Sequence, residues 1–268
     1  MTVVRRKYGK TGHGYTIDGS KVPGVTSILD KTLPKGGLKD WAARCAADEA
    51  IDCWDELAAL RPSERHKRLH YAYRHASDIA ARRGTEVHRL AEALNNDEDV
   101  TPPDELRGHV EAYRDFLDVM GVAPLVGGTE LVVASRTHLY CGTADLVADL
   151  PRLMLGYQQL AAARWLLEIK TSQARIYPES ALQGCGYVNA EIYVHPDQPD
   201  IEQPMSALGI ERCGVVWVKS DAWELRPVDT GLDTWTYFLH LRWLYDRRDD
   251  PDTWLGSAAA APAELEPA

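Results

Sequence analysis

Several features that mark large classes of protein are absent from this chain of 268 residues. It contains no run of eighteen apolar residues, so we expect no membrane-spanning helix. The first residues, Met1 to Tyr8, lack the apolar stretch of a secretory signal peptide. No internal repeat is visible. These absences favour a cytoplasmic protein with no membrane partner.

Cysteine is sparse and scattered along the chain. The five cysteines form no C-x-x-C pair: Cys45, Cys53, Cys141, Cys185 and Cys213. An odd number at wide spacing argues against both a disulfide framework and a zinc finger. We therefore expect buried or half-buried thiols.

A surplus of positive charge is also missing, since the net charge is −10. The charges are unevenly distributed, however. The first 90 residues hold 17 lysines and arginines against 11 acidic residues, whereas the remainder holds 13 against 29. The N-terminal third can therefore present a local positive surface. The ordinary alternative is that these cations are solvated helix faces.

Hydrophobic spacing predicts helices first and strands afterwards, which is an α/β protein of the α+β kind. A hairpin turning at Asp18-Gly19 precedes helices at 37–60, 62–95 and 103–119. Gly84 is expected to kink or break the second helix. Strands are then predicted at 129–134, 139–150, 164–171, 211–219 and 223–227, with helices at 178–193 and 231–247. Residues 151–163 are an insert, and residues 195–206 a loop.

This order suggests three parts. Residues 1–125 form an N-terminal hairpin and helical block, and residues 126–250 form the core that carries the strands. The last part, 251–268, is rich in alanine, proline and glutamate and is predicted to be disordered.

The strand containing Glu168-Ile169-Lys170 places a carboxylate and an ammonium on one face, because side chains alternate along a strand. The carboxylate can hold a divalent metal, and the lysine can orient or deprotonate a water. One acid-x-Lys triplet is about what chance supplies at ordinary composition. Its meaning therefore depends on its neighbours.

Three further acidic or imidazole side chains are candidates for the same site. Asp145 lies in an otherwise apolar strand, where an unpaired carboxylate would be costly unless a metal or a cation faces it. His88 and Glu92 share a helix face, so either could bind a metal, or Glu92 could orient His88. Glu130, early in a strand, is a looser candidate, since such a glutamate more often faces solvent.

Gln183 and Tyr187 lie one helical turn apart on a predicted helix. Their neutral polar groups suit contacts to phosphate or sugar. The ordinary alternative is a pair on a helix surface.

In this order the motifs resemble those of the PD-(D/E)XK nuclease superfamily. They are G-x-x-x-H ending at His88, a G-T-A-D strand ending at Asp145, E-I-K ending at Lys170, and Q-x-x-x-Y. The set is most similar to the RecB-like branch, which includes phage-encoded and CRISPR-associated exonucleases. The segment 23–29 and a Leu38…Trp41 pattern also resemble phage members. The resemblance covers roughly residues 20–247.

The resemblance implies a restriction-endonuclease-like core, a central mixed sheet flanked by helices. It implies that Asp145, Glu168, His88 and the carbonyl of Ile169 bind the metal, with Lys170 as the catalytic lysine beside the two carboxylates. Gln183 and Tyr187 would bind substrate. Glu92 and Glu130 would stand behind the metal ligands.

The implied cofactor is Mg²⁺ or Mn²⁺, as one or two ions. An iron–sulfur cluster is not expected, because the clustered cysteines of some relatives are missing. The implied function is a metal-dependent DNA exonuclease in phage or bacterial recombination, repair or replication, in the host cytoplasm if phage-encoded. A structure-specific endonuclease and a catalytically silent DNA-binding subunit are the alternatives. No G-x-x-x-x-G-K-[ST] motif occurs, so a helicase or recombination partner would be a separate chain.

Overall fold

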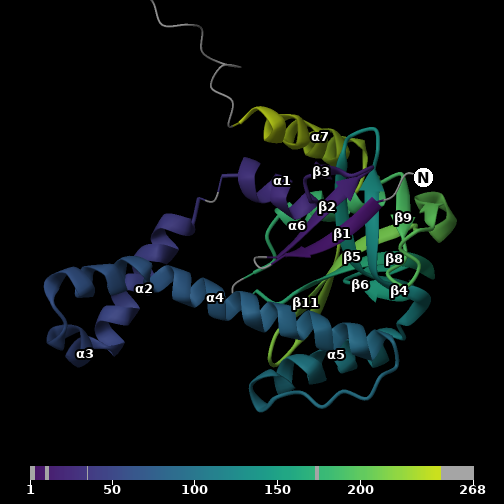
Figure 1. Ribbon diagram of the computed structural model, residues 1–268. Helices are drawn as coiled ribbons and strands as arrows, with labels where there is room; N and C mark the ends of the chain where they lie inside the picture. The colour runs from purple at the N-terminus through teal and green to yellow at the C-terminus, as the bar shows by residue number, and fades with distance from the viewer. Residues whose placement is uncertain (1–3, 10–11, 35, 173–174, 249–268) are drawn as a thin grey trace, which may run out of the picture.

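The computed structural model describes residues 4–9, 12–34, 36–172 and 175–248, so the predicted tail 251–268 lies outside the described residues. Its centre is a seven-stranded sheet in the order β10-β9-β4-β5-β8-β11-β12. Strands β8 and β11 are parallel, and the other neighbours are antiparallel. The sheet is therefore mixed. With helices against it (Figure 1), it confirms the predicted α+β class.

Five of the seven strands of this sheet were predicted from apolar runs, and β9 and β10 were not. They are β4 (Ala123–Ser135), β5 (Tyr140–Leu150), β8 (Ala163–Lys170), β9 (Ile192–Val194), β10 (Glu202–Pro204), β11 (Arg212–Val218) and β12 (Trp223–Pro227). Leu166 and Leu167 illustrate the alternation along β8. Leu166 belongs to a core with α1, α6 and α7, and Leu167 to a core with α4 and α5. Both faces of the sheet are thus covered.

The helices are α1 (Val25–Thr32), α2 (Leu38–Asp52), α3 (Trp54–Ala59), α4 (Pro62–Asn95), α5 (Arg107–Met120), α6 (Glu179–Val188) and α7 (Leu232–Arg247). Short 3-10 turns occupy Asp104–Leu106 and Met205–Leu208. The predicted helix at 37–60 is in fact two helices, separated at Cys53. Gly84 was expected to interrupt α4, but the helix runs straight through it.

The predicted helix at 178–193 ends at Val188 instead. The apolar residues after it form β9, which pairs with both β4 and β10. The predicted loop at 195–206 therefore contains a short strand. Sheet pairing has overridden a sequence that continued the helical spacing.

The N-terminal hairpin is confirmed and is larger than predicted. Strands β1 (Val4–Gly9), β2 (Gly12–Ile17) and β3 (Ser20–Val22) form one small sheet. Asp18 and Gly19 both have positive φ, as the tight turn between β2 and β3 requires. Buried side chains of β1 and β2 pack on β4, β5 and β9. The insert at 151–163 is a second hairpin, β6 (Leu153–Leu155) and β7 (Gln158–Leu160).

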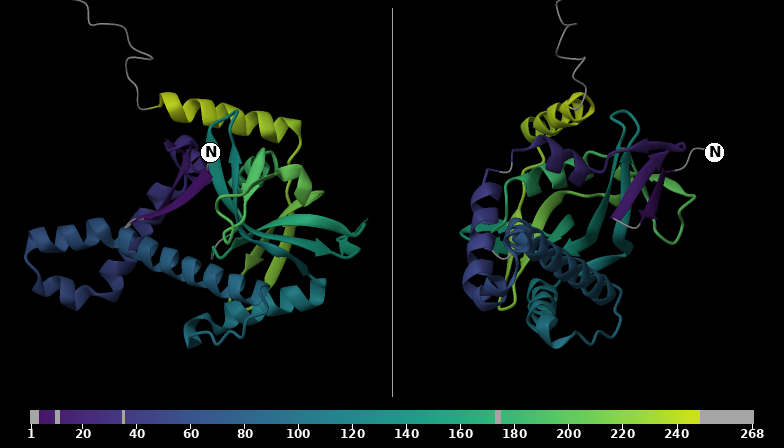
Figure 2. Two further views of the ribbon diagram at one scale, coloured as in Figure 1. Left: turned by 45° about the vertical axis from the view of Figure 1, so that its right-hand side comes forward. Right: turned by 60° about the vertical axis from the view of Figure 1, so that its left-hand side comes forward.

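Helices α2, α3 and the N-terminal part of α4 project from the body as an arm (Figures 1 and 2). Helix α2 buries no side chain, and of the residues at 37–60 only Leu57 on α3 is buried. Ile51 is 76% exposed and Trp54 63%. No helix in the described ranges is long and apolar enough to cross a membrane.

Candidate functional site

Asp145 on β5 and Glu168 on β8 lie beside each other, because the two strands pair with Leu146 opposite Leu167. The backbone N–H of Ile169 donates a hydrogen bond of 2.7 Å to Oδ2 of Asp145. Both carboxylates are nearly inaccessible to solvent. The sheet register thus brings together two acidic side chains that are 23 residues apart in sequence.

Lys170 and Gln183 complete a network around Glu168. Nζ of Lys170 lies 2.8 Å from Oε1 of Glu168 and 2.8 Å from Oε1 of Gln183. The Gln183 amide donates to Oε1 of Glu168 at 2.6 Å and to the Tyr187 hydroxyl at 2.8 Å. All four side chains point to one place between β8 and α6. Gln183 and Tyr187 are therefore not a helix-surface pair.

His88 approaches from the opposite side, on α4. Its Nδ1 lies 3.2 Å from Oδ1 of Asp145. Helix α4 comes close to the end of β8 at Gly84, one turn earlier. A Cβ at that position would lie 3.3 Å from Oγ1 of Thr171. The glycine that was expected to break the helix instead lets it pass close to the end of β8.

Burial and neighbouring charges both shift the pKa values of the site residues. Burial lowers the pKa of His88, but the Asp145 carboxylate outweighs it and raises that pKa to about 9. Burial opposes the charge of Asp145 as well, yet His88 and the Ile169 N–H hold the Asp145 pKa below its usual value. Asp145 is therefore an anion held by a cation and an N–H.

Glu168 behaves in the opposite way. Burial, reinforced by the charge of Asp145, raises the pKa of Glu168 to about 7 in spite of the neighbouring Lys170. Burial also disfavours the charge of Lys170, but Glu168 keeps the Lys170 pKa above its usual value. The site thus lacks enough positive charge to stabilise both Asp145 and Glu168 as anions.

One atom of Glu168 shows where further positive charge would fit. Its Oε1 accepts two hydrogen bonds, whereas its Oε2 is buried with no hydrogen-bond partner. An unsatisfied buried carboxylate oxygen is costly, and a divalent cation removes that cost. Carboxylate oxygens with one imidazole and a backbone carbonyl form a donor set that suits Mg²⁺ or Mn²⁺.

The side chains that would bind a metal are not arranged around one common point. Within the described residues, no three histidine, cysteine, aspartate or glutamate side chains gather as a group that could hold a metal ion. His88 and Lys170 are instead paired with the carboxylates. A metal bound here would depend on the Ile169 carbonyl, on water, or on displacement of these pairs.

Glu92 and Glu130 line the same cavity, which has a volume of about 440 Å³. Glu130 falls between the pairs Thr129–Leu146 and Leu131–Ala144, so it lies opposite Asp145 in the β4–β5 register. Its φ of +51° is unusual for a residue with a side chain. Strained backbone of this kind is concentrated at functional sites. Seven of the predicted site residues thus line one cavity: His88, Glu92, Glu130, Asp145, Glu168, Gln183 and Tyr187. Lys170 lines a neighbouring cavity of about 220 Å³, which shares Gln183 with the first.

The sequence interpretation missed one wall of this cavity. Tyr15, on the N-terminal hairpin, lines it and forms a 2.8 Å hydrogen bond between its hydroxyl and Oγ1 of Thr143. Thr26 of α1 and Arg89 of α4 also line it. Only the contact of the hairpin with β5 brings Tyr15 here. The G-T-A-D motif itself held a signal for Thr143, since that residue points to the same face as Asp145.

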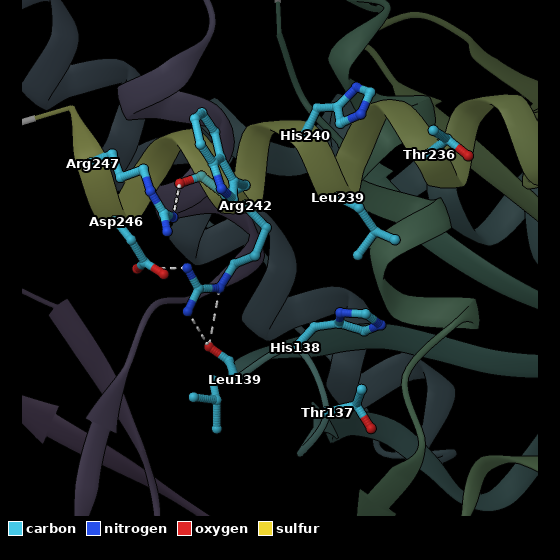
Figure 3. Close-up of a pocket in the computed structure, with 10 residues that line it drawn as sticks. Thr137, His138, Leu139, Thr236, Leu239, His240, Arg242, Asp246 and Arg247 are labelled. Carbon is cyan, nitrogen blue, oxygen red and sulfur yellow. Dashed lines mark hydrogen bonds and ion pairs between the residues drawn. The ribbon is translucent and has the colours of Figure 1, made fainter. Parts of the chain in front are cut away.

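A separate cavity of about 750 Å³ lies between α7 and the β4–β5 turn (Figure 3). Arg242 crosses it and donates to the carbonyl of Leu139 at 3.0 and 3.2 Å. The same guanidinium is ion-paired with Asp246 at 2.6 Å. None of the predicted site residues lines this cavity. Its arginine fixes α7 to the turn.

Comparison with known proteins leaves the family open. No protein-family model matches the chain, and no curated protein matches it either. One similar solved structure, described as "Crystal structure of SSO0001", covers 85% of both chains at 11% identity with a TM-score of 0.32. A likeness at that score carries no argument about fold family or function. Membership of the PD-(D/E)XK superfamily therefore stays a prediction.

Proposed function

We propose that this protein is a metal-dependent DNA exonuclease of the RecB-like PD-(D/E)XK type, with a restriction-endonuclease-like core. One observation carries the proposal. Side chains from α4, β5, β8 and α6 form one hydrogen-bonded cluster in the order that this nuclease type requires: His88, Asp145, Glu168, Lys170, Gln183 and Tyr187. Such a convergence of residues far apart in sequence is not needed for stability.

In this proposal Asp145, Glu168, His88 and the Ile169 carbonyl would hold Mg²⁺ or Mn²⁺. A divalent ion there supplies Lewis acidity, which acidifies water and offsets charge on a phosphate. Its necessity also follows from charge. The cavity is lined by four carboxylates, and its two cationic side chains, His88 and Arg89, are already paired with Asp145 and Glu86. A phosphodiester would be repelled without added cations.

Lys170 would act directly on the reacting groups. Two of its three N–H bonds are donated to Glu168 and Gln183, which leaves one for an attacking water or a phosphate oxygen. Because both partners are fixed in turn, the ammonium is held in one orientation before substrate binds. Preorganised donors of this kind stabilise charge that develops in the transition state.

His88 would orient Asp145 through Nδ1 in addition to holding the metal through its other ring nitrogen, and Gln183 would act as a positioning residue. His88 holds one oxygen of Asp145 while the Ile169 N–H holds the other. Gln183 joins Glu168, Lys170 and the Tyr187 hydroxyl in one network. Tyr187 is nearly buried and lines the cavity, where its ring and hydroxyl can contact the sugar of the bound strand.

The test is hydrolysis of end-labelled linear DNA and of covalently closed circular DNA, with Mg²⁺ or Mn²⁺ and with chelator. The expected result is metal-dependent release of nucleotides from linear DNA only. Lys170→Ala and Asp145→Asn should each reduce the rate by at least ~100-fold. Asp149→Asn is a matched control, because it changes an exposed carboxylate on the same strand that is paired with Arg164.

The other outcomes are equally informative. Cleavage of the closed circle at a rate similar to that of linear DNA would identify an endonuclease. DNA binding with no hydrolysis under any metal would identify a silent subunit. Unchanged hydrolysis by Lys170→Ala would remove the catalytic assignment altogether.

A further inference from the structure

The cations of the arm divide into two groups according to the face of α4 they occupy. Arg65 donates to the carbonyls of Leu57, Ala58 and Leu60, and Arg68 to the carboxylates of Glu49 and Glu56. Both arginines thus hold α2 and α3 against α4. They are structural and are not available to a ligand.

The second group lies on the other, exposed side of the helix. Lys67, His70 and Arg74 follow i, i+3, i+7 spacing, so they form one row along α4. All three are exposed. Within the described part of the chain, no carboxylate lies within ion-pair distance of them. The charges of Lys67 and Arg74 are therefore outside any ion pair in this part of the chain, and Nε of Arg74 donates to the Tyr73 hydroxyl at 3.0 Å.

Aromatic rings are interleaved with this row. The rings of His66 and His70 are parallel with centroids 6.0 Å apart, and the His70 ring meets the edge of Tyr71 at 4.7 Å. The guanidinium of Arg74 lies 4.6 Å from the centre of the Tyr71 ring. Tyr71 is still 38% exposed. Planar groups and cations therefore alternate along a solvent-facing strip, which we call the ring row (His66, Lys67, His70, Tyr71 and Arg74).

The ring row faces the same way as the candidate site. Arg74 precedes His88 by fourteen residues, which is close to four helical turns, so their side chains leave α4 in similar directions. The helix between them is continuous, since α4 runs from Pro62 to Asn95. From Lys67 to His88 the helix spans ~30 Å. A strand that leaves the cavity along this face meets the row.

We propose that the ring row binds single-stranded DNA and guides it to the cavity. This inference rests on the proposed nuclease function, which it extends by naming the form of the substrate. Bases stack on exposed rings and on guanidinium planes whatever their sequence, while Lys67 and Arg74 meet the phosphates. A duplex conceals its base faces and would use the cations alone. The interleaved rings therefore favour an unpaired strand, with a span of up to ~10 stacked nucleotides.

The experiment measures binding in chelator, so that no hydrolysis occurs. Fluorescently labelled single strands of 6 and 20 nucleotides and a 20-base-pair duplex are titrated with the full chain. We expect the wild type to bind the 20-mer strand more tightly than the 6-mer and more tightly than the duplex. Tyr71→Leu, which removes the ring and keeps apolar bulk, should weaken binding of the 20-mer roughly 5- to 100-fold, whereas Tyr71→Phe should not.

The salt dependence separates rings from charges. Lys67→Ala and Arg74→Ala should each flatten the plot of log affinity against log salt by roughly 0.7. Tyr71→Leu should lower affinity without changing that slope. Trp54→Ala is the matched control, since it removes an exposed ring of the same arm outside the row. If Tyr71→Leu proves unfolded by circular dichroism, the exposed pair His66→Ala with His70→Ala replaces it.

Two results would overturn the proposal. One is equal affinity of wild type and Tyr71→Leu for the 20-mer strand. The other is that the duplex binds as tightly as the single strand and that only Lys67→Ala and Arg74→Ala weaken this binding. Failure of the nuclease function is seen separately. Binding of the single strand without hydrolysis in Mn²⁺ would support the ring row and reject the nuclease function. Hydrolysis without binding of the single strand in chelator would support the nuclease function and reject the ring row.

Discussion

At the scale of single residues, Gln183 has the most contacts with other site residues. Its amide donates to Glu168 and Tyr187 and accepts from Lys170. Since glutamine carries no charge, it joins a cation to an anion without altering the balance between them. A carboxylate at this position would add a further negative charge to a site that already has too many.

This leads to a prediction for Gln183→Ala. The variant leaves Lys170 with one fixed partner instead of two, so the ammonium loses its orientation. We expect kcat for DNA hydrolysis to fall ~100-fold with little change in KM, because positioning is lost and binding is not. Asn189→Ala, which removes a polar side chain bonded to the Cys185 carbonyl at the end of the same helix, should retain activity. A rise in KM alone would contradict the role given to Gln183.

Site residues could be predicted from the sequence where burying the side chain without a partner would be costly. Asp145 could be recognised because an aspartate inside an apolar strand demands a partner. Tyr15 could not, because its sequence context is an ordinary hairpin strand and only long-range packing carries it to Thr143. The pairing of His88 with Asp145 also lay beyond the sequence, which left open whether Glu92 would hold that imidazole.

At the scale of elements, the close approach of α6 to β5 depends on Gly142. A Cβ on this residue would overlap the ring of Tyr187. The strand therefore presents bare backbone where the helix places its largest side chain. The G-T-A-D motif thus includes a glycine for packing as well as an acid for chemistry.

We predict that Gly142→Ala displaces Tyr187 and pushes α6 away from the sheet. The free energy of unfolding should fall by about 1–3 kcal/mol, the usual cost of overpacking a core. Hydrolysis should fall as well, because Gln183 lies on the same helix. Gly84→Ala is the contrasting variant. Its contact at 3.3 Å is with a side-chain hydroxyl that can rotate, and alanine favours the helix by up to about 1 kcal/mol, so stability should be unchanged or higher. Thermal denaturation of both variants tests the contrast.

Helices and strands were predictable where one hydrophobic spacing continued along the segment. Strands β5, β8 and β11 have runs of apolar residues that no turn interrupts, and each was expected close to its observed bounds. Strand β4 was predicted only from Thr129, and its first half lies beyond a register shift between Pro124 and Thr129. The failures share a different cause. Cys53 ends α2 without any glycine or proline, and β9 exists only because β4 and β10 pair with it. Neither feature has a local signal.

At the scale of the whole molecule, the site makes the fold sensitive to divalent cations. Asp145 and Glu168 belong to the two central strands of the sheet, so a ligand that binds them also joins β5 to β8. The negative net charge of −10 adds a general attraction for cations, but among the described residues only these two carboxylates are buried together.

We therefore predict that Mn²⁺ raises the melting temperature of the intact protein. At a metal concentration 100 times Kd, linkage gives about 2.7 kcal/mol, which corresponds to roughly 5–10 °C for a chain of this size. Asp145→Asn should abolish the increase, and Asp149→Asn should leave it intact. An equal increase in all three proteins would mean that Mn²⁺ acts on surface charge and not at the site.

The continuity of α4 has a mechanical consequence. The helix passes close to Thr171 at Gly84, and extends ~33 Å from there to Pro62 but only ~6 Å to His88. It is thus a lever with very unequal arms. A tilt of about 5° at that fulcrum moves the tip by ~3 Å and the imidazole by ~0.5 Å. Large excursions of the outer end are reduced to small ones beside Asp145, so the geometry there is insulated from the movements of whatever the arm holds.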